Sequence, residues 1–216
     1  DTPSGVARDR AGNVFVAGQS VLTNFNGVTL TNHGRVFLAK YDNAGSPQWA
    51  RKAGGGLTAQ FDQATALAAD TAGNVFLAGV FAGASAAFDW VAPLANRGGA
   101  DAFLARYDAA GGLQWVRQIG GGLDDRASGL AVDSAGNAYI VGEFTGTLQL
   151  PGTNLVTGVV DQNAFIARFD AAGVVNWARQ AGGTLPDAAR AVTVDRSDRV
   201  FVAGYFSGAA AFGTES

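Results

Sequence analysis

One motif recurs along the chain at steps of 61, 63 and 62 residues, and this repetition constrains the fold more than any other feature. The motif is a short apolar run ending in glycine, found at 12–18, 73–79, 136–142 and, in weaker form, 198–204. Internal repeats of this length indicate one small structural unit whose copies bury each other's apolar faces. The copies that the motif defines span 1–61, 62–124, 125–186 and, as a half copy, 187–216.

Each complete copy is predicted to contain four short β-strands. Strand two is the recurring motif, and strand one precedes it at 6–9, 67–70, 130–133 and 192–195. Strand three is an apolar-basic-aromatic block at 36–42, 102–108 and 164–170. Strand four contains one tryptophan in each copy, namely Trp49, Trp115 and Trp177, and closes on a Gly-Gly pair. These runs are rich in β-branched and aromatic residues, and they are too short and too glycine-bounded for helices.

The turns between these strands predict hairpins. An aspartate opens each turn and a glycine closes it three residues later, as in Asp9–Gly12 and Asp42–Gly45. Aspartate accepts backbone N–H bonds there, and glycine supplies the positive φ. Consecutive hairpins form an antiparallel meander that cannot cover both of its own faces, so the copies must stack. Radial stacking predicts an all-β propeller, since a β-helix needs shorter coils and a sandwich does not repeat so faithfully.

These motifs resemble the bacterial β-propeller repeat known as SBBP. That repeat runs Asp-x-x-Gly-Asn-Val-Tyr/Phe-Val-x-Gly, then an aromatic-Ser-Gly stretch, then Phe-Val-Ala-Lys-Tyr-Asp-x-x-Gly, Trp and Gly-Gly. Tyr205-Phe206-Ser207-Gly208 followed by Phe212-Gly213 matches the middle stretch closely. The resemblance covers essentially the whole chain. It implies an exported or surface protein, commonly of Bacteroidetes, and it brings no agreed catalytic set.

The number of strands predicts a partial ring. The copies add up to about three and a half blades, whereas propellers close with roughly four to eight. One explanation is that the chain is a fragment of a propeller of about seven blades, and this is the one we favour. The other is that two chains meet, but two spare halves made of strands one and two are not complementary.

Composition argues against several functions. A net charge of −3 gives no electrostatic case for nucleic acid. No apolar run is long enough to span a membrane, and the absence of cysteine excludes thiolate chemistry. Two glutamates, Glu143 and Glu215, and one histidine, His33, are a poor basis for a carboxylate pair or a Ser-His-Asp triad.

We therefore expect a non-enzymatic scaffold or binding module, extracellular or on the bacterial surface, that recognises protein or glycan. One alternative is part of a propeller hydrolase or lyase whose catalytic residues lie in missing blades. Another is a structural subunit of a surface assembly.

Candidate ligand-binding residues lie in the variable connections from strand two to strand three, because loops on a rigid scaffold commonly carry recognition. They are Phe25, Asn32, His33, Trp90, Asn96, Arg97 and Asn154. The alternative is that these connections form an outer hairpin that covers the blade edge.

No cofactor is expected, with calcium as the one alternative at the aspartates that begin the copies. Calcium needs six to eight oxygens, and the best positions are Asp124, Asp125 and Asp161. The simpler interpretation is that these aspartates cap turns or accept backbone N–H bonds.

Strands three and four also carry basic residues at fixed repeat positions. These are Lys40, Arg106, Arg168, Arg51, Arg117 and Arg179. We expect them to pair with aspartates across strands or to stack on aromatic rings, with a basic rim as the alternative. The repeated tryptophans are expected to pack between blades.

Overall fold

The computed structural model describes residues 2–21, 24–25, 28–30, 34–55, 62–89, 91–158 and 161–212. Within these ranges the chain forms β-strands and turns, so the predicted all-β class is confirmed. Among the same residues there is no helix long and apolar enough to cross a membrane.

Each of the first three copies forms a four-stranded antiparallel meander. In copy one the order is β1 (Thr2–Arg8), β2 (Val14–Gln19), β5 (Val36–Tyr41) and β6 (Pro47–Gly54). In copy two it is β7 (Gln63–Ala69), β8 (Val75–Phe81), β11 (Asp101–Tyr107) and β12 (Leu113–Ile119). In copy three it is β13 (Asp125–Val132), β14 (Ala138–Thr145), β17 (Gln162–Phe169) and β18 (Val175–Gly182). Copy four contributes the pair β19 (Ala188–Val194) and β20 (Val200–Tyr205).

The first strand of every copy is longer than the sequence pattern predicted. It begins about four residues earlier and ends one residue before the turn aspartate. A β-bulge interrupts its pairing in each copy, for example between Pro3 and Gly5 in β1 and between Ala127 and Gly129 in β13. The bulge breaks the alternation of apolar and polar positions, which is why the pattern revealed only the second half of the strand.

The connections from strand two to strand three contain additional short hairpins. These are β3 (Asn24–Phe25) with β4 (Val28–Thr29), β9 (Ser85–Phe88) with β10 (Val91–Ala95), and β15 (Thr147–Leu150) with β16 (Thr153–Val156). Two of them also bond to strand four of the preceding copy. Ala53 of β6 is opposite Phe88 of β9, and Gly120 exchanges two backbone hydrogen bonds with Gln149 of β15. In copy four, β21 (Ala211–Phe212) pairs with β18 in the same way. The outer hairpin thus covers an edge that would otherwise be unpaired.

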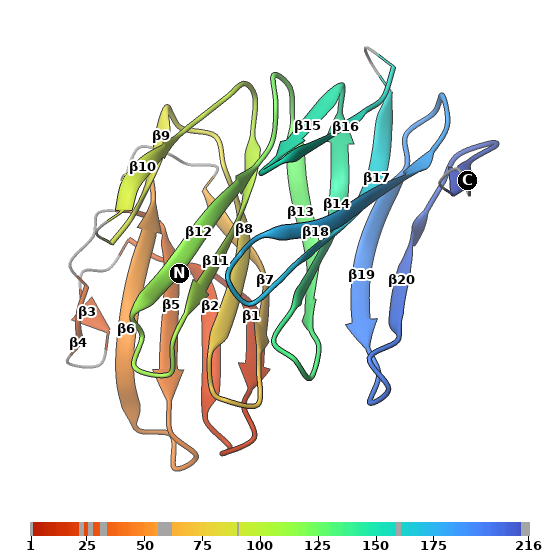
Figure 1. Cartoon of the computed structure of the whole chain (residues 1–216). Coiled ribbons are helices and arrows are strands. Elements are labelled where there is room, and N and C mark those ends of the chain that lie inside the picture. Colours follow the sequence, from red (N-terminus) through yellow and green to blue (C-terminus); the bar gives the residue numbers. More distant parts are fainter. Residues whose placement is uncertain are drawn as a thin grey trace.

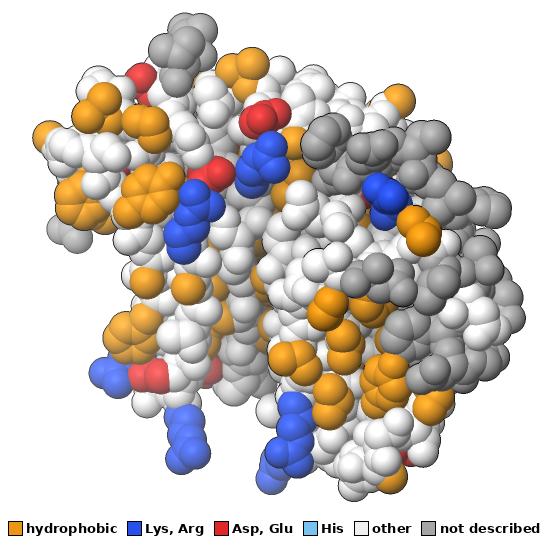
Figure 2. All heavy atoms as spheres, turned by 180° about the vertical axis from the view of Figure 1, so that it is seen from behind, with side chains coloured by type: hydrophobic (Ala, Val, Ile, Leu, Met, Phe, Trp, Pro, Cys, Tyr) orange, Lys and Arg blue, Asp and Glu red, His pale blue; other side chains and the backbone are white. Residues whose placement is uncertain are grey.

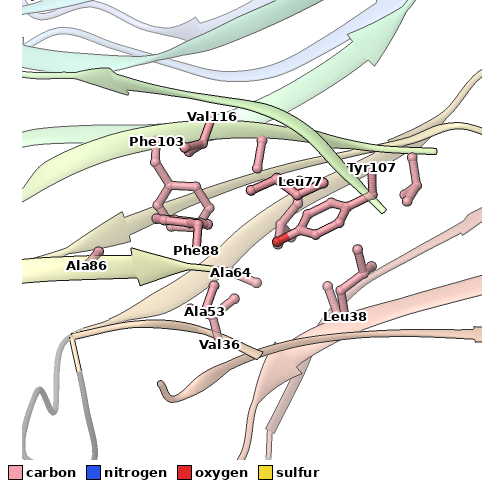
Figure 3. Close-up of a cluster of buried hydrophobic side chains, with 14 of the residues drawn as sticks. Val36, Leu38, Ala53, Ala64, Leu77, Ala86, Phe88, Phe103, Tyr107 and Val116 are labelled. Carbon is pink, nitrogen blue, oxygen red and sulfur yellow. The ribbon is translucent and has the colours of Figure 1, made fainter. Parts of the chain in front are cut away.

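The copies stand side by side in a fan, in sequence order from the red end of the chain to the blue end (Figure 1). The first strands β1, β7, β13 and β19 lie against one another in succession. Apolar side chains fill the space between neighbouring sheets. Figure 3 shows the cluster between copies one and two, where Leu38 and Leu77 lie near Tyr107, and Phe88 lies against Phe103. A second cluster of the same kind joins copies two and three.

Candidate interaction site at the junctions between copies

The aspartates that begin copies two to four, Asp62, Asp125 and Asp187, are buried tethers between neighbouring copies. Each carboxylate accepts the N–H of the second glycine of the preceding Gly-Gly pair: Gly55, Gly121 and Gly183. Asp62 and Asp187 also accept a backbone N–H from just after strand two of their own copy, that of Ala82 and of Ser207. In copy three the N–H of Thr145, at the end of β14, lies near enough to lower the pKa of Asp125. A buried carboxylate that bonds two copies in this way holds them in register.

These carboxylates explain why strand four of each copy is followed by two glycines. The first glycine of the pair lies so close to them that a Cβ has no room. At Gly54 a Cβ would lie 2.7 Å from Oδ2 of the tether Asp62, and at Gly182 it would lie 2.6 Å from Oδ2 of the tether Asp187. At Gly120 the close carboxylate is that of Asp101, whose Oδ1 would lie 2.2 Å from a Cβ. The first glycine therefore leaves space for a carboxylate, and the backbone N–H of the second glycine donates a hydrogen bond to the tether.

One position facing each tether differs from copy to copy. It precedes the apolar block of strand three and is Arg35 in copy one, Asp101 in copy two and Asn163 in copy three. Burial raises the pKa of both Asp62 and Asp125; the charge of Arg35 opposes this rise at Asp62, whereas the charge of Asp101 adds to it at Asp125. Sequence reasoning missed this position, although the change of charge at one aligned position of the repeat was a signal that could have found it.

The junction between copies two and three brings two buried acids together. Burial is the largest cause raising the pKa of Asp125 to about 7, and the neighbouring charges of Asp101 and Asp124 raise it further. Burial also raises the pKa of Asp101, against the hydrogen bonds from Arg97 N (2.8 Å) and Gln118 Nε2 (2.6 Å). One carboxylate oxygen of each acid, Oδ1, is buried without a partner. The site is suited to holding a proton at neutral pH.

The metal positions suggested by the sequence are occupied by protein hydrogen bonds or lie apart. Asp124 Oδ1 accepts the Ala100 N–H at 2.9 Å, and its Oδ2 contacts Arg126 at 3.4 Å. Asp161 lies in the separate loop that precedes β17. Across the described part of the chain, no three Asp, Glu, His or Cys side chains form a group able to hold a metal ion. The tethers accept backbone N–H bonds, as the simpler interpretation predicted.

Three of the candidate ligand-binding residues lie at the same end of the array. Arg97 Nη1 donates to the carbonyl of Gly120 at 3.1 Å and to that of Gln149 at 3.5 Å. Asn96 Nδ2 donates to the Gly99 carbonyl at 2.8 Å. Asn154 is exposed on β16, directly opposite Gln149. Asn96 thus stabilises its own loop, and Arg97 bonds that loop to the neighbouring hairpin, while Asn154 faces outward.

The remaining candidates are not placed by these contacts. Asn32, His33 and Trp90 lie outside the described residues. Phe25 belongs to β3, but only its backbone is described.

The repeated tryptophans and arginines of strand four join each copy to the next. Trp49 Nε1 donates to the Ala109 carbonyl at 3.1 Å, and Trp115 Nε1 donates to the Ala171 carbonyl at 3.0 Å. The next arginine along the strand, Arg51 or Arg117, donates Nε to Gly111 or Gly173 of the same turns. The packing of Trp49 and Trp115 between copies is therefore confirmed.

The basic residues stack on aromatic rings, which confirms one of the two expected roles. Lys40, Arg106 and Arg168 lie over the rings of Phe15, Phe76 and Tyr139. The stacking alternative of the prediction is thus the one that holds for these residues. Lys40 and Arg106 donate to the carbonyls of Ala109 and Ala171 in the next copy, because the turn presents its carbonyls toward them.

Antiparallel four-stranded sheets standing face to face, each locked to the next through its fourth strand, define the class of β-propeller repeat proteins. Residues 114–143 match the family model of the beta-propeller repeat SBBP, which spans β12, β13 and β14. The resemblance to this family is thereby confirmed over residues 114–143, and the fold is that of β-propeller repeats.

Two curated proteins are similar to the chain. An uncharacterised WD repeat-containing protein of Acanthamoeba polyphaga mimivirus is 25% identical over 80% of the chain and 14% of its own length. Regulatory protein FlaEY of Caulobacter vibrioides is 32% identical over 61% of the chain and 13% of its own length. The chain thus corresponds to about one seventh of the length of these relatives.

Proposed function

We propose that this chain is a non-enzymatic, extracellular β-propeller module in which a rigid repeat scaffold presents variable outer hairpins to a protein or glycan partner. The observation that carries the proposal is how the repeat uses its polar groups. The turn aspartates, the tether aspartates and the strand-four arginines all bond to the backbone of the repeat itself. Side chains engaged in this way are not available for chemistry on a substrate.

The outer hairpin β15–β16 is the part of this scaffold most suited to recognition. Leu148 and Leu150 are buried beneath it, while Gln149, Thr153 and Asn154 are exposed on strands paired with each other. A hairpin anchored by buried leucines presents its amides on a fixed surface, which limits the entropy lost on binding. Amide and hydroxyl groups complement the hydroxyl-rich surface of a glycan.

The names of the relatives support the scaffold part of the proposal, since one is described as a WD repeat-containing protein and the other as a regulatory protein. The extracellular location rests on the resemblance to SBBP repeats of exported bacterial proteins.

A hairpin exchange tests the proposal. Residues 147–156 are replaced by 85–95, the outer hairpin of copy two, and both chains are applied to a panel of immobilised oligosaccharides. We expect the natural chain to bind a subset of the panel and the exchanged chain to lose that binding at least tenfold, with the same melting temperature.

The matched control replaces the buried Leu150 by Ile, which leaves the exposed amides unchanged. Equal binding by the natural and exchanged chains would contradict the role of the hairpin. Cleavage of any bound sugar, detected as new reducing ends, would contradict the non-enzymatic part.

A further inference from the structure

The acid pair Asp101 and Asp125 is enclosed between the four-stranded sheets of copies two and three. Both residues are fully buried, and each has one carboxylate oxygen, Oδ1, without a hydrogen-bond partner. Two carboxylates buried side by side repel each other strongly when both are ionised, because little water is present to screen them. The junction therefore depends on the protonation of the pair.

Arg97 and Asp124 are the other charged side chains that act on the pair. Burial raises the pKa of Asp101, and the charge of Arg97 opposes this rise. Burial also raises the pKa of Asp125, and the charges of Asp101 and Asp124 add to the rise. One arginine thus faces the pair, and it acts on Asp101 rather than on Asp125.

The arginines of the neighbouring strands are engaged with other carboxylates. Arg126 of β13 forms an ion pair with Asp124 at 3.4 Å. Glu143 lies opposite Arg126 on β14, and its carboxylate contacts Arg190 of β19 at 3.0 Å. Figure 2 shows acidic and basic side chains next to one another near the top of the array. These ion pairs leave the charge of the buried acid pair in place.

The outer hairpin β15–β16 is bonded to the segment that holds Asp101. Gly120 exchanges two backbone hydrogen bonds with Gln149 of β15, at 3.2 and 3.3 Å, and its Cα lies against Asp101 Oδ1. Arg97 forms a second link, because its N–H donates to Asp101 Oδ2 at 2.8 Å and its Nη1 donates to the carbonyls of Gly120 and Gln149. Figure 1 shows this hairpin at the top of the fan, beside the end of β12.

Gly121 joins the second acid to the same hairpin. Its N–H donates to Asp125 Oδ2 at 2.6 Å, and a Cβ on it would collide with the carbonyl oxygen of Thr147 in β15. Leu148, the next residue of β15, is fully buried. Residues 147–156 carry no charged side chain. The attachment of the hairpin is therefore sensitive to the charge of the acids beneath it and not to charges of its own.

We propose that the acid pair is a pH-sensitive switch, which fixes the hairpin β15–β16 to copy two while one acid holds a proton and releases it when both acids are ionised. Lifting the hairpin together with Gly120 and Gly121 admits water to the pair, and water removes most of the repulsion between the two carboxylates. The switch goes beyond the proposed function, because it concerns how firmly the hairpin is held and not what the hairpin recognises.

The pKa of Asp125 sets the direction of the effect. In the folded chain it is about 7, above the ordinary value of 3.8. The closed junction therefore binds a proton at neutral pH that an opened, hydrated junction has released, so a rise in pH favours opening. With these pKa values, the equilibrium constant for opening increases about tenfold between pH 6 and pH 8.

Amide hydrogen exchange of the 216-residue chain, measured residue by residue by NMR at pH 6 and pH 8, tests the switch. Observed rates are divided by the intrinsic rates at each pH, because intrinsic exchange itself accelerates with pH. We expect the N–H groups of Gly120 and Gln149 to lose about tenfold in protection at pH 8. The first junction is the internal control. There β9 is bonded to β6, but the tether Asp62 faces Arg35, so we expect little change in the protection of β9.

Two variants remove the repulsion in different ways. Asp101→Asn removes one charge of the pair, and Asp125→Asn removes the group that titrates. In both variants we expect the protection of Gln149 to be the same at pH 6 and pH 8. The third junction shows that an amide is accommodated at this position, since Asn163 stands there beside Asp187.

Asp108→Asn is the matched control variant, because Asp108 lies in the turn between β11 and β12, away from the pair. We expect it to keep the tenfold change of the natural chain.

Four results would overturn the proposal. The first is equal protection of Gln149 at pH 6 and pH 8 in the natural chain, and the second is an equal change at β9 and β15. The third is a pH dependence that survives in both asparagine variants. The fourth is exchange of β8 and β11 at the same rate as Gln149, which would assign the effect to unfolding of the whole array. No ligand is added, so failure of the proposed recognition would leave these results unchanged.

Discussion

The two junctions that flank copy two have the same architecture and opposite electrostatics. At the first junction the tether Asp62 faces Arg35, and the buried Lys52 lies close to that arginine. At the second junction the tether Asp125 faces Asp101, and Gln118 stands where Lys52 stood. The backbone bonds made by the two tethers are the same in kind. Both junctions thus have a tether aspartate at the same repeat position. The residue at the facing position determines whether the charge beside that aspartate is of opposite sign, as with Arg35, or of like sign, as with Asp101.

The largest expected effect comes from neutralising the two tethers separately. Asp62→Asn removes the carboxylate charge that faces Arg35 and the charge-assisted bonds that it accepts from the N–H groups of Gly55 and Ala82, so we expect a loss of about 3 kcal/mol in the free energy of unfolding at pH 8. Asp125→Asn removes one of two like charges, so we expect a change below about 1 kcal/mol at the same pH. Urea unfolding of both variants measures the difference. Equal losses would show that the backbone bonds, and not the facing charges, determine the cost.

The second effect concerns pH. The pKa of Asp125 is about 7 in the folded chain, against an ordinary value of 3.8. Between these values Asp125 binds a proton in the folded state that it has released in the unfolded state, so its contribution to stability falls as pH rises from about 4 to 7 and is then level. Asp101→Asn removes a neighbouring charge and is expected to add about 1–2 kcal/mol at pH 8 and little at pH 4.

Unfolding by urea across pH 4–8 measures this change for the natural chain and the variant. Asp108→Asn, in an exposed turn away from the tether, serves as the control. A variant whose pH profile is parallel to that of the natural chain would exclude coupling between Asp101 and Asp125.

The smallest effect is expected at the third junction, where Asn163 faces Asp187. Asn163→Asp reproduces the acid pair of the second junction, and we expect a loss of about 1 kcal/mol at pH 8 that disappears toward pH 4. The same urea titration tests it. If the loss persisted at pH 4, it would reflect the hydrogen bonds of the amide rather than charge.

Much of the fold could be predicted from the sequence because the strands are local and the repeat shows them several times. The Asp-x-x-Gly turns are an example: Asp9 Oδ1 accepts the Asn13 N–H, and Gly12 has a φ of 89°. Asp198 replaces that glycine in copy four and keeps a positive φ of 58°, with its carboxylate bonded to Ser134. The outer hairpins were harder to predict because they are short and irregular. Their pairing with the preceding copy also depends on contacts between distant residues, which leave no pattern within the hairpin sequence.

The residues of the candidate site also differ in how far the sequence could predict them. Arg97 and Asn154 lie in the variable connections, and Arg97 joins two copies by donating to the carbonyls of Gly120 and Gln149. Asp101 was missed because a lone aspartate before a strand has no local signature. Its meaning depends on Asp125, which lies one copy further along the chain.

The sequence by itself determined the repeat, the hairpin turns, the all-β class and the positions of the repeated tryptophans. These properties depend on residues a few positions apart, whose spacing encodes backbone geometry directly. Only the tertiary structure decided which charges meet across a junction and which edge is covered by an outer hairpin. Those properties depend on burial and on contacts between copies about sixty residues apart, as in the bond from Trp49 to Ala109. Burial then changes the pKa of a carboxylate by an amount that composition does not specify.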